Sequence, residues 1–377
     1  MNKNKDTRTG SKWRTQAARW GIGAAAAALL AAGLPAETGL AAPAAAVQKA
    51  AVQKAAQSTV LLKWNGAVTK QQGLYKEGAV WVPVSFLRDT LKLNVTYNKE
   101  QQTYQVGSGV RKLTLYVSEY GISPSVNGFF LSEYEGLLQS GKLYVPVGLL
   151  TDYMGYQADF SKASGRLNLM PKAQNALAVS SSTYAADKEG AAIHLEYPQI
   201  SGLNNAAVQQ KINETLKQAN AAFTAEMNNE LAKRGEDERP YEFDSRFLVT
   251  YNSNGLLSLV MDQYSYLGGA HGMTYRQGFT FSLKDGKRLL LKDLFGANPD
   301  YKKVLNAKAG KELRAMGGYL GGFTGLTTEK YFYLKEGKAV LFFQLYDYTA
   351  YAQGFPLVTF DFKELLPPGQ SVLGALK

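Results

Sequence analysis

Hydrophobic residues recur every three or four positions between residues 208 and 231, which is the spacing of one face of an α-helix. Asn204 precedes this stretch and is a favourable N-cap residue, so the pattern predicts a long amphipathic helix from about residue 204. Its apolar face must pack on something, and we expect a sheet. The apolar positions are Val208, Ile212, Leu216, Ala219, Phe223, Met227 and Leu231.

Alternation of apolar and polar residues predicts strands before and after this helix. The first covers residues 193–197, and Pro198 is expected to end it. A second helix is expected over residues 301–316, with Gly317-Gly318 after its end. The class predicted is α+β, with an antiparallel sheet packed against a long helix and a second helix. The other predicted strands are 243–251, 256–266, 277–283, 329–334, 339–346 and 356–362.

The part of the chain before this module contains an internal repeat with a period of 62 to 63 residues. Each half predicts a hairpin turn, a strand, a short helix and a closing strand, so this segment is expected to be a small two-fold α+β domain. The closing strands are expected at residues 103–106 and 166–169. The paired anchors are Asn65-Gly66 with Asn127-Gly128, the segment 81–89 with the segment 144–152, and Tyr97 with Phe160.

These anchors resemble the small repeat domain named after the N-terminal domain of copper amine oxidases, over residues 59–172. The resemblance implies a stalk or wall-associated module on an exported protein. It does not carry oxidase chemistry, because the Asn-Tyr-Asp/Glu site of the quinone cofactor is absent and two histidines cannot supply a three-histidine copper site. No cofactor is expected.

Several motifs in the C-terminal half occur in an order that resembles a second architecture. They include Tyr-Pro-Gln-Ile-Ser-Gly-Leu from residue 197, Gly-Gly-Ala-His-Gly from residue 268 and Phe-Gln-Leu-Tyr-Asp-Tyr from residue 343. Residues 184–366 look like the paired domains of unknown function found outside the cell in lysozyme-sensing anti-sigma factors and beside the catalytic domain of some peptidoglycan deacetylases. This resemblance implies a cell-envelope binding or sensing module.

The N-terminal region has the pattern of an export signal. Six basic residues precede an apolar run over residues 20–34, and Ala44-Ala45-Ala46 offers a cleavage site. The predicted organisation is a signal peptide (1–46), a linker (47–58), the repeat domain (59–172), a linker (173–183), a first extracellular domain (184–270), a second extracellular domain (271–366) and a tail (367–377).

Net charge and cysteine content limit the classes of partner that this protein is expected to have. Removal of the signal peptide takes away six basic and two acidic residues, which lowers the formal charge from +11 to +7. A basic exported protein is held near anionic wall polymers or lipid headgroups, so peripheral contact with wall or membrane is expected. The chain has no dense stripe of Lys and Arg, so nucleic acid is not expected as a partner. The absence of cysteine excludes disulfides and thiolate sites, and favours a Gram-positive surface protein.

His271 is the residue most easily taken for a catalytic base. A triad would need a nucleophile and an orienting carboxylate, and only Ser265, Asp262 and Ser282 are close in sequence. A zinc site would have to combine His271 with His194 and carboxylates from distant segments. No catalytic residue and no metal ligand is therefore assigned.

The interpretation favoured for the loop is a tight turn in which Gly268, Gly269 and Gly272 permit unusual backbone angles and the imidazole bonds to the backbone. A binding role is the alternative, because tyrosines suit the recognition of sugars and proteins. Half-buried strand positions would explain the same tyrosines equally well. The candidate binding residues are Tyr264, Tyr266, His271, Tyr275, Tyr346, Tyr348 and Tyr351.

Taken together, the sequence predicts a secreted, cell-wall or cell-surface protein that binds or senses without catalysing a reaction. Its ligand is expected to be peptidoglycan, another wall polymer or a wall-active protein. One alternative is a wall-directed hydrolase or esterase that uses His271. Another is a structural spacer between wall layers.

Overall fold

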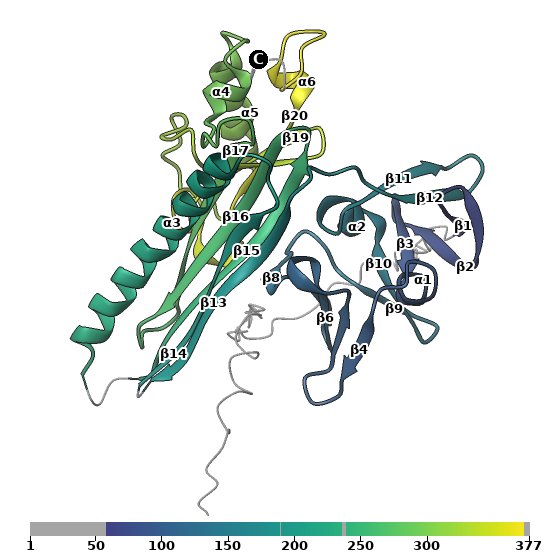
Figure 1. Ribbon diagram of the computed structural model, residues 1–377, viewed down its shortest axis with the longest axis horizontal. Coiled ribbons are helices and arrows are strands. Elements are labelled where there is room, and N and C mark those ends of the chain that lie inside the picture. Colours follow the sequence, from purple (N-terminus) through teal and green to yellow (C-terminus); the bar gives the residue numbers. More distant parts are fainter. Residues whose placement is uncertain (1–57, 189, 236–238, 373–377) are drawn as a thin grey trace, which may run out of the picture. The chain divides into compact units, whose positions relative to one another are not determined.

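The computed structural model describes residues 58–188, 190–235 and 239–372 (Figure 1). The predicted signal peptide, the linker up to residue 57 and the last five residues of the predicted tail lie outside the described residues. The fold is α+β, as expected, with four sheets in the described ranges. No helix in the described part of the chain is both long enough and apolar enough to span a membrane.

The repeat domain has two sheets, whose strand orders are β11-β12-β1-β2-β3-β10-β9 and β4-β5-β6-β7-β8. A 3₁₀ turn covers Gly109–Arg111. The strands are β1 (Ser58–Trp64), β2 (Ala67–Lys76), β3 (Ala79–Pro83), β4 (Val95–Asn98), β5 (Thr103–Val106), β6 (Leu113–Ser118), β7 (Gly121–Val126), β8 (Phe129–Phe130), β9 (Leu137–Gln139), β10 (Lys142–Pro146), β11 (Tyr156–Ser161) and β12 (Arg166–Pro171), and the helices are α1 (Val84–Asp89) and α2 (Val147–Tyr153).

The repeat found in the sequence is also a repeat of structure. Asn65-Gly66 and Asn127-Gly128 both have positive φ angles, as their hairpin turns require. Strands β3 and β10, which carry the Val-Pro anchors, pair antiparallel with Val82 opposite Val145 and with each half's proline opposite the other half's aromatic residue. The two halves are therefore joined through equivalent strands.

The C-terminal half is organised around one long sheet of order β13-β14-β15-β16-β17. All neighbouring strands are antiparallel except β14 and β15, which are parallel and are connected by the long helix α3. Asn254-Gly255 forms the β15–β16 hairpin turn with positive φ at both residues. The elements are β13 (Ala178–Lys188), β14 (Ala191–Ser201), α3 (Ala206–Lys233), β15 (Tyr241–Ser253), β16 (Leu256–Tyr266) and β17 (Met273–Ser282).

Helix α3 lies along one face of this sheet (Figure 1). The predicted apolar face is confirmed: Val208, Ile212, Leu216, Phe223 and Met227 are buried against the sheet. Each such side chain stabilises the fold by about 1.5 to 3 kcal/mol relative to exposure. The cap is one residue later than predicted. The side chain of Asn205, and not that of Asn204, accepts hydrogen bonds from the backbone of Ala207 and Val208 at 3.1 and 3.2 Å.

One strand prediction and one linker prediction around β14 need correction. Pro198 does not end this strand, which continues to Ser201. A proline is tolerated there because β15 pairs with β14 only as far as Leu195, so the missing N–H leaves no ladder bond to β15 unmade. Residues 178–183, expected in a linker, instead form the first half of β13, because the long β14 offers them a pairing edge.

The last part of the chain adds a three-stranded sheet of order β18-β19-β20 and three helices around their own apolar core. The second predicted helix is confirmed as α5. The strand expected over 339–346 ends at Phe342, because a turn closes where Asp347 donates its backbone N–H to the Gln344 carbonyl. The elements are α4 (Leu291–Phe295), α5 (Tyr301–Ala315), β18 (Phe332–Lys335), β19 (Lys338–Phe342), β20 (Leu357–Asp361) and α6 (Phe362–Leu365).

The sheet face opposite α3 is only partly covered. Leu248 and Val260 share one core with the repeat domain and with Tyr333 of β18. Gly278 of β17 lies directly against the backbone of Phe332, where a larger residue would not fit. The strand β17 therefore ties the start of the predicted second domain to the sheet of the first.

Candidate functional site

The loop between β16 and β17 brings an aromatic group together around Gly272. The ring of Tyr264 packs so closely on Gly272 that a Cβ at this position would overlap the ring. The carbonyl oxygen of Gly272 accepts hydrogen bonds from the Tyr351 hydroxyl and from Nδ1 of His271, both at 2.9 Å. The missing side chain of Gly272 leaves the space that the Tyr264 ring occupies.

The imidazole of His271 is held from both sides. Its ring stacks on Tyr351 with centroids 4.2 Å apart, and the Tyr346 hydroxyl lies 3.2 Å from Nε2. Because the Gly272 carbonyl can only accept, Nδ1 carries the proton in neutral His271, and Nε2 accepts from Tyr346. Among the described residues, no serine hydroxyl and no carboxylate bonds to this ring, so His271 lacks the partners of a triad.

Tyr346 presents its ring from a strained backbone position. Its φ is +67°, a region that non-glycine residues seldom occupy, and the residue is 48% exposed. Such strain persists where surrounding contacts hold it, and it is concentrated at binding and catalytic sites. Tyr264, His271, Tyr346 and Tyr351 thus form one connected group, which we call the aromatic surface.

The other three candidate tyrosines do not belong to this group. Tyr266 donates to the Gly269 carbonyl at 3.0 Å, at the start of the same loop. Tyr275 alternates to the opposite face of the sheet, where its hydroxyl lies 3.1 Å from that of Tyr331. Tyr348 packs edge-on against Phe323 and Phe343 and so contributes to the core beneath the loop.

The glycines of the loop differ in what they provide. Gly268 adopts a φ of +78°, which suits a residue without Cβ. Gly269 has open space around the position of a Cβ, and Gly272 has none. Of the three candidate turn residues, Gly268 thus serves the turn itself and Gly272 the packing of aromatic rings.

A charged network lies beside the aromatic surface on β14 and β15. Arg246 donates to Asp244 at 2.8 and 2.9 Å and to Glu196 at 3.0 Å. His194 lies between the same two carboxylates, 3.4 Å from Glu196 and 3.5 Å from Asp244. The guanidinium occupies the position that a cation would take, and the described residues contain no group of His, Asp or Glu suited to a metal ion.

Glu242 is the carboxylate in this region that sequence reasoning missed. It pairs in register with Tyr266, while its strand neighbour Asp244 pairs with Tyr264. Burial and the charge of Asp244 raise the pKa of Glu242. The signal was present in the sequence, because Glu242, Asp244 and Arg246 alternate with Phe243 and Phe247, which places the charged residues on one face.

These carboxylates also affect the neighbouring ring. Burial and the nearby charge of Glu242 raise the pKa of Tyr264 to about 12. At neutral pH the Tyr264 hydroxyl is therefore protonated and remains able to donate a hydrogen bond. Acidic and aromatic groups therefore meet at one end of β15 and β16, on the same face of the sheet.

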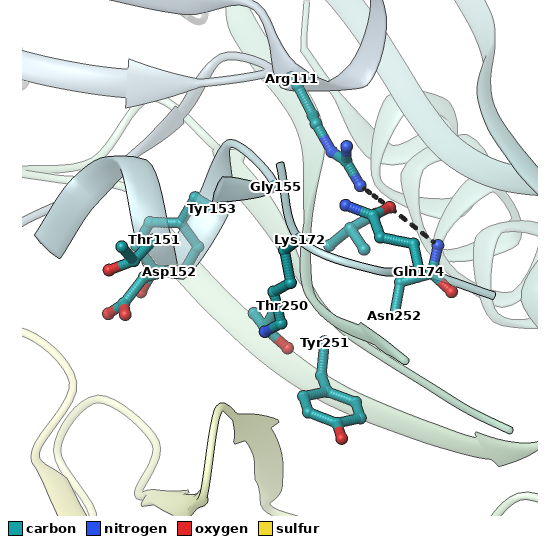
Figure 2. Close-up of a pocket in the computed structure, with 11 residues that line it drawn as sticks. Arg111, Thr151, Asp152, Tyr153, Gly155, Lys172, Gln174, Thr250, Tyr251 and Asn252 are labelled. Atoms are coloured by element: carbon teal, nitrogen blue, oxygen red, sulfur yellow. Dashed lines mark hydrogen bonds between the residues drawn. The ribbon is translucent and has the colours of Figure 1, made fainter. Parts of the chain in front are cut away.

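A small pocket lies where α2 meets β15 (Figure 2). Arg111 points into it and donates to Gln174, which also accepts from Asn252 at 3.4 Å. Burial lowers the pKa of Arg111. Lys172 stacks over Tyr251 and forms an ion pair with Glu336. Because these side chains bond chiefly to one another, we interpret the pocket as a polar contact that stabilises the fold.

Three family descriptions match successive segments of the chain. Residues 63–169 match the copper amine oxidase N-terminal domain, residues 184–274 match a family described as deacetylase PdaC, and residues 292–363 match a protein family of unknown function, DUF3298. The two resemblances inferred from the sequence motifs are thereby confirmed. Of these segments, residues 184–274 are the one similar to a family named for a deacetylase.

Individual relatives are distant. A peptidoglycan-N-acetylmuramic acid deacetylase, PdaC, from Bacillus subtilis (strain 168) is 26% identical over 117 residues, which are 29% of this chain and 25% of that protein. This chain therefore spans about a quarter of the length of that relative.

Two solved structures of DUF3298 proteins are also similar to part of the chain. The protein from Bacteroides fragilis NCTC 9343 is 18% identical and covers 51% of this chain and 93% of its own, with a TM-score of 0.38. The protein from Pseudomonas aeruginosa PAO1 is 16% identical and covers 51% and 96%, also with a TM-score of 0.38.

Proposed function

We propose that this chain is an exported protein of a Gram-positive cell wall, and that its C-terminal module binds an envelope glycan through the aromatic surface without catalysing a reaction. The observation that carries the proposal is the stacked and hydrogen-bonded group of His271, Tyr346 and Tyr351 around Gly272. Rings held in place before binding lose little conformational entropy when a ligand stacks on them.

The chemistry of the group suits a sugar. Tyrosine rings offer flat apolar faces for the C–H faces of pyranose rings, and their hydroxyls remain close by for polar contacts. Tyr346 is half exposed, so its ring is accessible to a polymer in solution. The hydrogen bonds of His271 to Gly272 in its own loop and to Tyr346 make it a support for the rings, which agrees with a binding role and leaves it poorly arranged to act as a base.

The relatives support a wall destination. The matched region of the Bacillus subtilis protein belongs to an enzyme named for its action on peptidoglycan. A family description that names a deacetylase covers residues 184–274, which include Tyr264 and His271. We extend to this chain the wall environment of that relative and none of its chemistry.

The test is co-sedimentation of the full chain with purified Gram-positive sacculi. At about 1 M salt the Debye length is about 3 Å, so binding that depends only on the basic net charge should disappear. We expect binding to persist. Tyr351→Ala should weaken it by about 10-fold, which corresponds to about 1.4 kcal/mol for one stacking ring.

Tyr120→Ala is the matched control, because Tyr120 is 81% exposed and lies in the repeat domain. It should bind sacculi as the unchanged chain does. Complete loss of sedimentation at high salt, or equal binding by the Tyr351→Ala and Tyr120→Ala variants, would refute the proposal.

A further inference from the structure

The carboxylate of Glu242 has no hydrogen-bonding or ion-pair partner in the described part of the chain, although the residue is half buried. A carboxylate removed from water without a partner is costly, and proteins usually provide one. Arg246, on the same face of β15, is already engaged by Asp244 and Glu196. Negative charge is therefore left uncompensated at Glu242.

This carboxylate adjoins the aromatic surface. Glu242 acts electrostatically on Tyr264, and Asp244 is the register partner of Tyr264 across the strands. Tyr264 in turn packs on Gly272, to which Tyr351 and His271 are bonded. A ligand that stacks on these rings also meets the acidic residues at this end of β15.

The aromatic surface and the carboxylate of Glu242 both favour a positively charged ligand. The faces of tyrosine rings attract cations, and the attraction is stronger where the cation is desolvated. An ammonium group placed beside Glu242 would compensate its charge and relieve the cost of its burial. A neutral glycan would gain the stacking alone.

We infer that the aromatic surface and Glu242 together form a site for an amino-bearing glycan, in which hexosamine residues have lost their N-acetyl groups. This inference rests on the proposed glycan-binding function and specifies its ligand class. The sugar rings stack on Tyr346 and Tyr351, and a protonated amine pairs with Glu242. Charge complementarity selects this ligand over the N-acetylated polymer, whose amide is neutral.

The experiment compares two probes by calorimetric titration of the full chain at pH 6: a glucosamine hexamer and an N-acetylglucosamine hexamer. We expect the glucosamine hexamer to bind about 10-fold more tightly, the effect of one additional ion pair near the surface of the protein. Glu242→Gln should abolish this preference and leave the affinity for the acetylated hexamer unchanged. Glu226→Gln, on the exposed side of α3, is the matched control and should keep it.

The outcomes separate this inference from the proposed function. If both hexamers bind equally and Glu242→Gln changes nothing, the amino-glycan inference is overturned while glycan binding stands. If neither hexamer binds and Tyr351→Ala does not affect sedimentation with sacculi, both ideas are wrong. Tetralysine that binds as tightly as the glucosamine hexamer would show that the site reads charge alone, which also overturns the inference.

Discussion

Gly272 shows how one residue can determine a binding surface without contributing a side chain to it. Its carbonyl anchors Tyr351 and His271, and its missing Cβ leaves the space that Tyr264 fills. The histidine that stands out in the sequence depends on the glycine beside it. The glycines of the loop, Gly272 above all, are therefore the residues to alter first.

Gly272→Ala is predicted to destabilise the protein by about 2 kcal/mol, since the new methyl group displaces the ring of Tyr264. It should also weaken binding to sacculi. Gly269→Ala is the matched control, because no atom lies within 4 Å of its Cβ position, and it should unfold at the same denaturant concentration as the unchanged chain. Equal midpoints for the two variants would contradict the packing role given to Gly272.

The raised pKa of Glu242 predicts how the stability of the fold depends on pH. Burial and Asp244 raise its pKa in the folded protein above the ordinary 4.5, so the folded state binds this proton more tightly than the unfolded state. Its contribution to stability therefore falls as the pH rises through 4.5 toward the raised value. Glu242→Gln should increase the melting temperature at pH 7 by about 1 to 2 °C, a small effect because the group is partly screened by solvent.

The comparison must be repeated at acidic pH. Well below pH 4.5 the carboxyl is protonated in both states, so the difference between Glu242→Gln and the unchanged chain should vanish. A variant that melts lower at pH 7 would show that Glu242 has a stabilising partner.

Part of this site was predictable from the sequence. Alternation placed Tyr264 and Tyr266 on one face, and the glycines marked a loop. The pairing of His271 with Tyr346, 75 residues away, depends on the turn at residues 344–347, which interrupts a stretch that reads as a continuous strand. Periodicity alone cannot reveal such a turn, because φ at Tyr346 is set by tertiary contacts.

At the scale of elements, helix α3 connects two parallel strands and covers one sheet face. Its buried positions were predictable because they follow the helical period over 28 residues. The N-cap of the helix was less predictable than its buried face, because Asn204 and Asn205 are residues of the same type and equally suitable as caps. The backbone conformation selected Asn205.

Asn205→Ala is predicted to destabilise the fold by about 1 kcal/mol, because two backbone N–H groups of the first turn lose their acceptor. Asn204→Ala changes the same residue type one position earlier and should have little effect. Urea unfolding of the two variants would decide between these residues. An equal loss of stability in both would contradict the assignment of the cap.

The ends of the strands were also predictable only where a local sequence signal marks them. The range 256–266 was predicted to the residue because a hairpin turn and a glycine-rich loop bound it. The length of β14 was underestimated, because proline ends a strand only where its N–H is needed, and the pairing of β14 with β15 stops at Leu195, three residues before Pro198. The end of such a strand depends on its neighbours in the sheet, and the local sequence pattern gives no information about them.

At the scale of the whole molecule, a largely buried lysine connects the repeat domain to the C-terminal half. Lys335 of β18 lies 3.0 Å from Asp152 of α2 and 3.2 Å from Glu133. Burial alone would lower its pKa, but the charges of Asp152 and Glu133 outweigh this effect and raise it. The contact was not predictable, because nothing in the spacing of these residues connects them.

Lys335→Met is predicted to destabilise the protein by about 2 kcal/mol, since it leaves two partly buried carboxylates without their cation. The carboxylates retain some access to water, which keeps the loss below that of a fully buried pair. Lys338→Met, at an exposed position of β19, should be close to neutral in the same urea titration. Equal midpoints for the two variants would show that the cluster contributes nothing to stability.

The pairing of β3 with β10 has a consequence for how such a domain can arise. The two strands are copies of one segment, and each meets the other with Val82 against Val145 at the centre of symmetry. A single ancestral half would expose this self-complementary edge and could satisfy it with a second molecule of its own kind. The present repeat domain can then be understood as a dimer whose two subunits have become one chain, freeing each half to diverge in the turns and edges that face its surroundings.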